Sequence, residues 1–159
     1  MRAQDIVKLV VSLLLPLGSG AIGGLATSAA IPTWYQELSK PAFSPPNWLF
    51  GPAWTVLYLL MGIAAFLVWR LGWGTPGVRI ALAAFLGQLL LNALWSLLFF
   101  GLRSPLAGMV EIVVLWLAVG LTIVLFARVS IAAGLLLLPY IGWVTFAAVL
   151  NGAILALNR

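Results

Sequence analysis

Tryptophan and amide side chains at helical spacing are the residues of this sequence with the clearest chemical capacity. One set recurs at i, i+4, i+7 and i+11 of an apolar stretch: Gln88, Asn92, Trp95 and Phe99. Such positions share one face of an α-helix. Two amides turned toward an apolar surrounding would leave hydrogen bonds unmade, so we expect this face to point into a helix bundle.

A second face of this kind lies near the end of the sequence. Its members recur at i, i+4, i+7 and i+8: Trp143, Ala147, Leu150 and Asn151. A large ring, a gap left by a small residue and an amide are suited to lining a cavity for a flat ligand. Trp54 and Tyr58, four residues apart, place two more rings on one face of an earlier stretch.

Several familiar chemistries are excluded by composition. The sequence contains no cysteine and no histidine, so it lacks a thiolate nucleophile and the commonest general base and metal ligand. We therefore expect no metal site and no hydrolytic active site.

The elements that position these side chains are membrane helices. With 64% hydrophobic and 7% charged residues among 159, and a mean hydropathy of +1.18, the chain is too apolar for a water-soluble globule. We predict an all-α integral membrane protein with one domain, residues 1–159, and one helix bundle. Its five spans cover about residues 6–30, 52–69, 78–102, 106–127 and 131–157, each long enough to cross a bilayer.

Glu111 is the only acidic residue inside a predicted span. Carboxylates are costly within a bilayer, and those found there are often functional. Glu111 lies little more than one turn into the fourth span, so two interpretations stay open. It either takes part in ligand binding or extends to the lipid headgroups.

A Pro-rich, aromatic loop covers residues 31–51, between the first two spans. Prolines at 41, 45 and 46 stiffen it by fixing φ and restricting the preceding residues. A stiff connection of this length favours a functional lid, whereas tryptophan and tyrosine also serve as anchors at the membrane interface.

The basic residues are scattered singly at the ends of apolar runs, which argues against nucleic-acid binding despite the net charge of +5. Five lie on the N-terminal side: Arg2, Lys8, Arg70, Arg79 and Arg128. Three lie on the other: Lys40, Arg103 and Arg159. This difference places the N-terminus in the cytoplasm, with the loop outside. We also expect a homodimer, because Ala83 and Gly87, or Gly20 and Gly24, form faces of small residues where helices approach closely.

Three segments of the sequence occur in this order: WYQELSKPAFSPPNWLFGPAWTVLYLLMG, QLLLNALWSLLFFG and PYIGWVTFAAVLN. Together they resemble the successive signatures of the tryptophan-rich sensory protein family, TspO, also called the translocator protein or peripheral benzodiazepine receptor. The resemblance extends from about Gly18 to Asn151. It implies a five-helix protein of the bacterial cell membrane, commonly dimeric, whose first loop caps a cavity for porphyrins and synthetic benzodiazepine-type ligands.

Carried onto this sequence, the resemblance and the helical faces give one set of ligand-binding candidates: Tyr35, Trp54, Tyr58, Asn92, Trp95, Glu111, Trp143, Phe146, Ala147 and Leu150. Asn92 would be the polar handle. No cofactor is required, and the expected ligand is protoporphyrin IX or a related tetrapyrrole. It would be metal-free, since no histidine or cysteine is present to ligate haem iron. Gly152 stands where the family's sterol-recognition pattern has tyrosine, which argues against cholesterol binding.

Three classes of function are compatible with this sequence. The first is a sensor or receptor that binds tetrapyrroles and regulates their level or passage. The second is a light-dependent enzyme that breaks porphyrins down, with Trp54 and Trp143 as redox partners. The third is a transporter of small lipophilic molecules.

Overall fold

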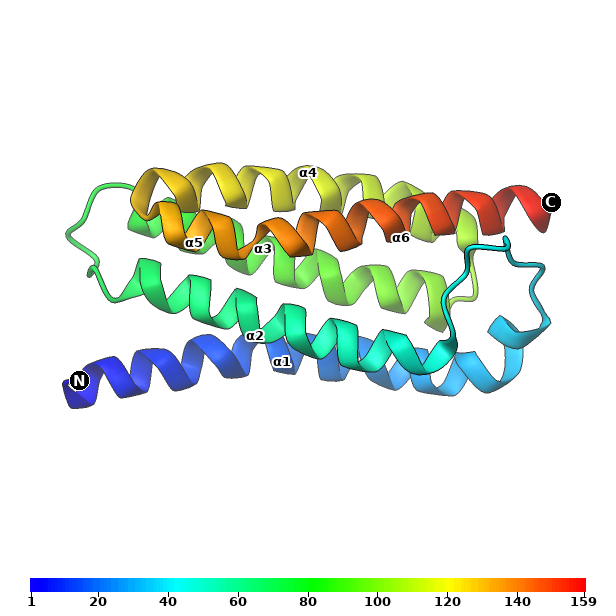
Figure 1. Ribbon diagram of the computed structural model, residues 1–159, viewed down its shortest axis with the longest axis horizontal. Helices are drawn as coiled ribbons and strands as arrows, with labels where there is room; N and C mark the ends of the chain where they lie inside the picture. Colours follow the sequence, from blue (N-terminus) through cyan, green and yellow to red (C-terminus); the bar gives the residue numbers. More distant parts are fainter.

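A bundle of long helices makes up the protein in the computed structural model, which describes residues 1–159 (Figure 1). Five helical segments are long and apolar enough to cross a membrane, and no strand is present. The predicted fold class, an all-α membrane protein with five spans, is confirmed.

The helical elements follow one another with short connections. Their bounds are α1 Ala3–Ala30, η1 Ile31–Tyr35, η2 Asn47–Leu49, α2 Phe50–Trp69, α3 Val78–Ser96, η3 Leu97–Gly101, α4 Pro105–Val129, α5 Ile131–Leu136 and α6 Leu138–Leu157. Here η1 and η3 are π-helical turns that continue α1 and α3, and η2 is a 3-10 turn before α2.

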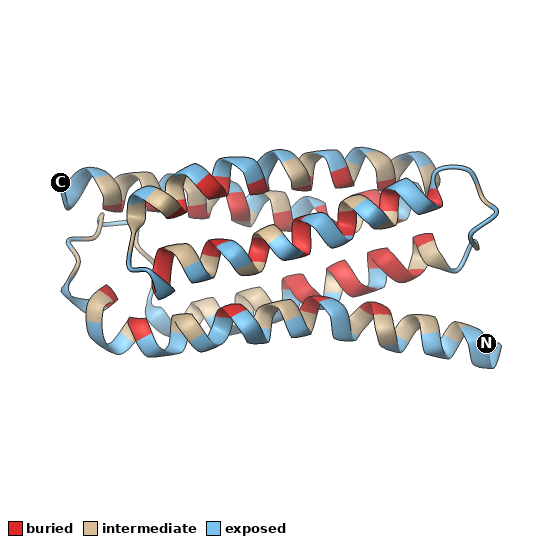
Figure 2. Ribbon diagram, turned by 180° about the vertical axis from the view of Figure 1, so that it is seen from behind, coloured by how far each residue is buried: buried red, intermediate tan, exposed pale blue.

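The five spans cross the bundle in alternating directions, so the two termini lie at opposite ends (Figure 1). Helix α1 packs along α2 and α3, α4 packs along α3, α5 and α6, and α2 packs against α5. Helix α1 is peripheral: of its 28 residues only Ser12, Pro16, Gly23 and Ala30 are buried (Figure 2).

The loop predicted for residues 31–51 is shorter in the structure, because η1 extends α1 and α2 begins at Phe50. Pro32 lies in the first turn of η1. A π-helical turn is wider than an α-helical one and accommodates a residue that would break the regular ladder. The Thr33 hydroxyl donates to the carbonyl of Ala29 at 2.9 Å, which satisfies an acceptor at this irregular turn. Within the predicted loop, only residues 38–46 are non-helical, and we call this segment the lid.

The fifth span is interrupted, as its proline predicts. Helix α5 ends at Leu136 and α6 begins at Leu138, with Pro139 in the first turn of α6. Proline fits there because the missing N–H would have no intrahelical partner in the first turn. The interruption lets α5 pack against α2 while α6 continues along α4.

Glycine sets the approach of α1 to α2 at one end of their contact. A methyl group at Gly62 would lie 2.8 Å from the carbonyl oxygen of Ser12 and 2.8 Å from Cα of Leu13. The two backbones are therefore in direct contact here. Toward the lid end the contact is made by a side chain instead, since the ring of Tyr58 packs on Gly20.

Candidate ligand site

Eight aromatic residues from three spans and from η1 meet beneath the lid, and we call them the aromatic cluster: Tyr35, Phe50, Trp54, Trp95, Phe99, Phe100, Trp143 and Phe146. Trp54 of α2 and Trp143 of α6 lie edge to face with ring centroids 6.4 Å apart. Trp95 of α3 stacks on Phe99 at 5.4 Å. Ala147, Leu150, Asn151 and Ile154 complete the wall along α6.

The cavity inside the aromatic cluster is very small. Its volume is about 20 Å³, which is near the space that one water molecule needs. Pockets for small organic ligands have volumes of about 300–1,000 Å³. A ligand the size of a porphyrin therefore cannot lie within the cluster alone in this conformation.

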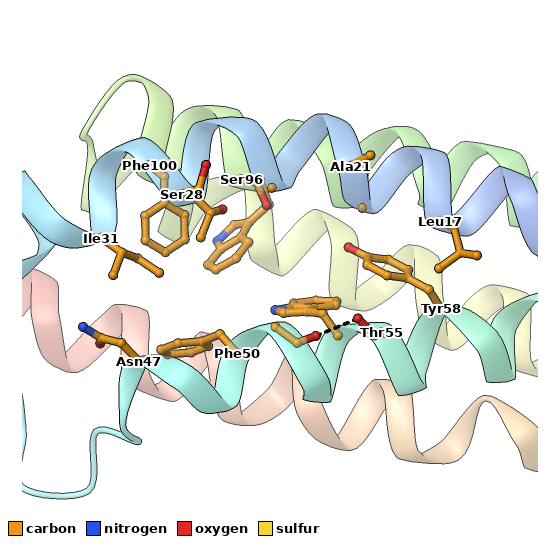
Figure 3. A pocket seen from close by; sticks show the side chains of 16 residues that line it. Leu17, Ala21, Ser28, Ile31, Asn47, Phe50, Thr55, Tyr58, Ser96 and Phe100 are labelled. Atoms are coloured by element: carbon orange, nitrogen blue, oxygen red, sulfur yellow. Dashed lines mark hydrogen bonds between the residues drawn. The ribbon is translucent and has the colours of Figure 1, made fainter.

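A larger cavity of about 430 Å³ opens beside the cluster, between the lid-end halves of α1 and α2. We call it the α1–α2 groove. Figure 3 shows side chains from both helices, and Ser96 and Phe100 from the α3–η3 span, lining it. Four cluster rings also form its inner wall: Phe50, Trp54, Trp95 and Phe100. The groove and the cluster are thus two parts of one site.

Small residues on α1 create the groove. A side chain added at Gly24 would meet no atom within 4 Å, whereas Gly20, one turn earlier, is covered by the Tyr58 ring. Thr27 and Ser28 add hydroxyl groups to the lining. Both hydroxyls donate to carbonyls of α1, Thr27 to Gly23 at 2.9 Å and Ser28 to Leu25 at 3.2 Å.

A buried hydrogen-bond network runs across the bundle behind the groove. The Tyr58 hydroxyl donates to Asn92 Oδ1 at 2.8 Å, Asn92 Nδ2 donates to the Tyr140 hydroxyl at 2.9 Å, and that hydroxyl donates to Gln88 Oε1 at 2.7 Å. Both ends of the Asn92 amide are therefore engaged by other side chains. Asn92 as a polar handle for a ligand stays a prediction, and in this conformation the handle is shared with Tyr58 and Tyr140.

Two other donors in the cluster are free. The Tyr35 hydroxyl and Trp143 Nε1 are buried and form no hydrogen bond, although Ser44 of the lid lies near Tyr35. Buried polar groups normally have partners. Tyr35 and Trp143 both line the cavity of the cluster, so each brings an unused hydrogen-bond donor to the site.

Glu111 is buried on α4, with 6% of its surface exposed. Neither carboxylate oxygen has a hydrogen-bond partner, and the buried polar residues include no lysine or arginine. The interpretation in which Glu111 extends to the headgroups is wrong, because its side chain and both carboxylate oxygens are buried inside the bundle. Glu111 lines neither the cluster nor the groove.

The predicted site residues therefore divide into three groups. Those that line the cluster are Tyr35, Trp54, Trp95, Trp143, Phe146, Ala147 and Leu150. Tyr58 lines the groove, and Asn92 and Glu111 lie behind it. The α1 side of the groove was missed, because Gly20 and Gly24 were assigned to helix packing and dimer formation. The serine and threonine that follow them, at helical spacing, were the available signal.

Two residues of the lid contact the aromatic cluster. Phe43 of the lid contacts Phe146 of the cluster edge to face, with centroids 6.4 Å apart. Lys40 lies over the Tyr35 ring at 4.8 Å. Both contacts join the lid to residues that line the cavity.

Comparison with known proteins identifies the relatives of this five-helix bundle. The sequence profile of the TspO/MBR family matches residues 12–157. The chain belongs to the TspO/MBR family. It is 52% identical to "Tryptophan-rich protein TspO" of Archaeoglobus fulgidus, over 98% of this chain and 99% of that protein. The corresponding protein of Chlorobaculum tepidum is 45% identical, over 98% of each chain.

The family extends to animals, where the human "Translocator protein" is 40% identical over 74% of this chain and 70% of its own. This membership confirms the resemblance carried by the aromatic and proline motifs. It also establishes the protein as an integral membrane protein of a family named for sensors and translocators.

Proposed function

We propose that this TspO/MBR protein is a membrane receptor that binds porphyrins and related flat lipophilic molecules, and thereby regulates tetrapyrrole level or passage. The observation that carries the proposal is that Phe50, Trp54, Trp95 and Phe100 belong to both the groove and the cluster. A flat ring in the groove would stack on this shared wall. The names "sensory protein" and "translocator protein" of relatives agree with a role in sensing or passage.

The lining of the site favours the apolar part of a tetrapyrrole. No residue that lines the groove or the cluster is charged, so the ring system would lie inside and any carboxylates would lie toward the headgroups. The free Tyr35 hydroxyl and Trp143 Nε1 would supply the hydrogen bonds that fix its orientation.

The site also favours binding from the bilayer. The groove lies on peripheral helix α1, and its outer residues Ala21, Gly24 and Ser28 are exposed. Lipid surrounds this surface in a membrane protein, so a lipophilic ligand dissolved in the bilayer would meet the groove directly.

We propose a homodimer in the cell membrane with the N-terminus in the cytoplasm. The Ala83/Gly87 face of α3 is exposed, and a side chain added at Gly87 would meet no atom within 4 Å. Gly20 is covered by Tyr58 within one chain, which leaves α3 as the better of the two faces for close helix contact.

Light-dependent breakdown of the bound porphyrin is a second candidate function. It is favoured by the edge-to-face pair of Trp54 and Trp143 and by the stacking of Trp54 on Tyr58 at 5.5 Å. Together these rings form a short path for single electrons beside the site. Dioxygen would be the oxidant in such a reaction, and light would supply the energy.

Titration of the purified protein with protoporphyrin IX in the dark tests the proposal. We expect saturable quenching of tryptophan emission with micromolar affinity, and recovery of the porphyrin unchanged after extraction. Loss of porphyrin on illumination, faster with protein than without, would favour the enzyme. Net flux into proteoliposomes would favour a transporter, and absence of saturable quenching would contradict all three.

A further inference from the structure

A side chain beyond the end of α6 holds the lid by two reciprocal hydrogen bonds. The backbone N–H of Ser39 donates to Asn158 Oδ1 at 3.0 Å, and Asn158 Nδ2 donates to the Ser39 carbonyl at 2.8 Å. An amide side chain can do this because it has an acceptor oxygen and a donor nitrogen side by side. The contact joins segments that are far apart in the sequence but meet at the same end of the bundle (Figure 1).

The Asn158 amide is held in position by its own helix. Nδ2 also donates to the Ile154 carbonyl at 2.8 Å, one of the acceptors left free at the end of α6. Both hydrogens of the amide are thus used, one on the helix and one on the lid. The orientation that the lid needs is fixed before the lid docks, which lowers the entropy lost on docking.

The adjacent lid residues are fixed as well. Lys40 Nζ donates to the carbonyls of Tyr35 at 2.7 Å and Leu38 at 3.2 Å, which ties the lid to the end of the first span. Phe43 then contacts Phe146. The Asn158–Ser39 contact is the one that ties the lid backbone to α6 by hydrogen bonds.

We propose that Asn158 is a latch that keeps the lid closed over the aromatic cluster, and so acts as a positioning residue for the ligand site. Its effect on ligand exchange rests on the function proposed above, whereas its effect on the lid does not. With the latch released, the lid opens more often, and ligand enters and leaves the cluster faster.

Hydrogen exchange at the Ser44 amide tests the latch without any ligand. This N–H donates to the Pro41 carbonyl within the lid at 3.0 Å and does not touch Asn158. In Asn158→Ala and Asn158→Asp we expect its exchange to become about tenfold faster, the effect of losing hydrogen bonds of ordinary net strength. Aspartate is the sharper variant. It can still accept from the Ser39 N–H, but its second oxygen cannot donate to the Ser39 and Ile154 carbonyls and repels them instead.

Gln4→Glu, at the opposite end of the bundle, is the matched amide-to-acid control and should leave the exchange unchanged. If the Ser44 amide of both Asn158 variants exchanges as in the parent protein, the latch is wrong. The readout separates a latch from a simple helix cap, since a cap alone would alter exchange at the end of α6 and not in the lid.

Stopped-flow quenching by protoporphyrin IX then tests the consequence for the ligand. We expect the association and dissociation rates of the Asn158 variants to rise together, by about the same factor, with little change in Kd. Faster lid exchange with unchanged porphyrin rates would support the latch and count against a ligand site beneath the lid.

Discussion

The indole rings of Trp54 and Trp143 meet at 84° with their centroids 6.4 Å apart, although one belongs to α2 and the other to α6. Phe50 contacts Trp143 at the same centroid distance. Helix α2 packs closely against α5 but stands off from α6, so large rings fill the space between these helices.

Filling the groove should weaken ligand binding without destabilising the fold. In Gly24→Leu the new side chain enters a space with no atom within 4 Å of the added Cβ, and leucine is favoured over glycine within a helix by about 1 kcal/mol. We expect protoporphyrin affinity to fall about tenfold or more in a fluorescence titration, with Tm unchanged or higher.

Gly18→Leu is the matched control for this variant. Gly18 also lies in α1 with no atom within 4 Å of an added Cβ, but it does not line the groove. Equal affinity of the two leucine variants would show that the groove takes no part in binding.

Inserting a methyl group into the direct backbone contact between α1 and α2 should destabilise the bundle. In Gly62→Ala the methyl group would lie 2.8 Å from backbone atoms that cannot move independently, and such overpacking costs about 1–3 kcal/mol. Thermal unfolding in detergent micelles should show a lower Tm. Gly142→Ala is the control, because Gly142 lies on an exposed face of α6 with no atom near the added Cβ, and it should have the Tm of the parent protein. A similar Tm for both variants would mean that α1 and α2 do not make backbone contact at Gly62.

Replacing Glu111 with methionine should stabilise the protein. A buried polar group without partners costs about 1–3 kcal/mol, and the Glu111 oxygens have none. Gln88→Leu should have the opposite effect, because it removes the acceptor of the Tyr140 hydroxyl. Denaturation in the same detergent measures the stability of both variants against that of the parent protein. A loss of stability in Glu111→Met as large as that in Gln88→Leu would mean that Glu111 has a partner in the membrane.

The sequence was sufficient to predict the bundle and one wall of the site. Long apolar runs can only be membrane helices in a chain of this composition. The spacing of Trp143, Ala147 and Leu150 places them on one helix face, and the structure puts that face along the cluster. Their role in binding stays a prediction.

Thr27 and Ser28 were the sequence signal for the α1 side of the groove, but its shape and the hydrogen-bond partners depend on how the helices sit against one another. Gly20 and Gly24 both belong to the same face of small residues, yet one is covered by Tyr58 and the other borders open space. In the same way, the spacing predicts that Asn92 faces inward but cannot show that Tyr58 and Tyr140, from two other helices, occupy both ends of its amide.

The proposed orientation in the membrane, with the N-terminus in the cytoplasm, rests on the excess of basic residues on the N-terminal side of the bundle. The chain has no cysteine, so single introduced cysteines can be labelled without background. Cysteines at Ser44 and Ser104, at the lid end, should react with an impermeant thiol reagent applied to intact cells, and a cysteine at Thr75 should not. The reverse labelling pattern would mean that the lid faces the cytoplasm.

The central claim is that the rings of the aromatic cluster bind a tetrapyrrole, and a protoporphyrin IX titration of tryptophan variants tests it most directly. Trp143→Leu and Trp54→Leu should each weaken binding about tenfold, since a lost stacking ring costs about 1–2 kcal/mol. Ala147→Leu should do the same by filling the cavity that Ala147 lines. Trp73→Leu, at a 52% exposed position in the turn at the opposite end, should titrate like the parent protein. If all four variants have the affinity of the parent, the cluster is ordinary helix packing and the porphyrin site lies elsewhere.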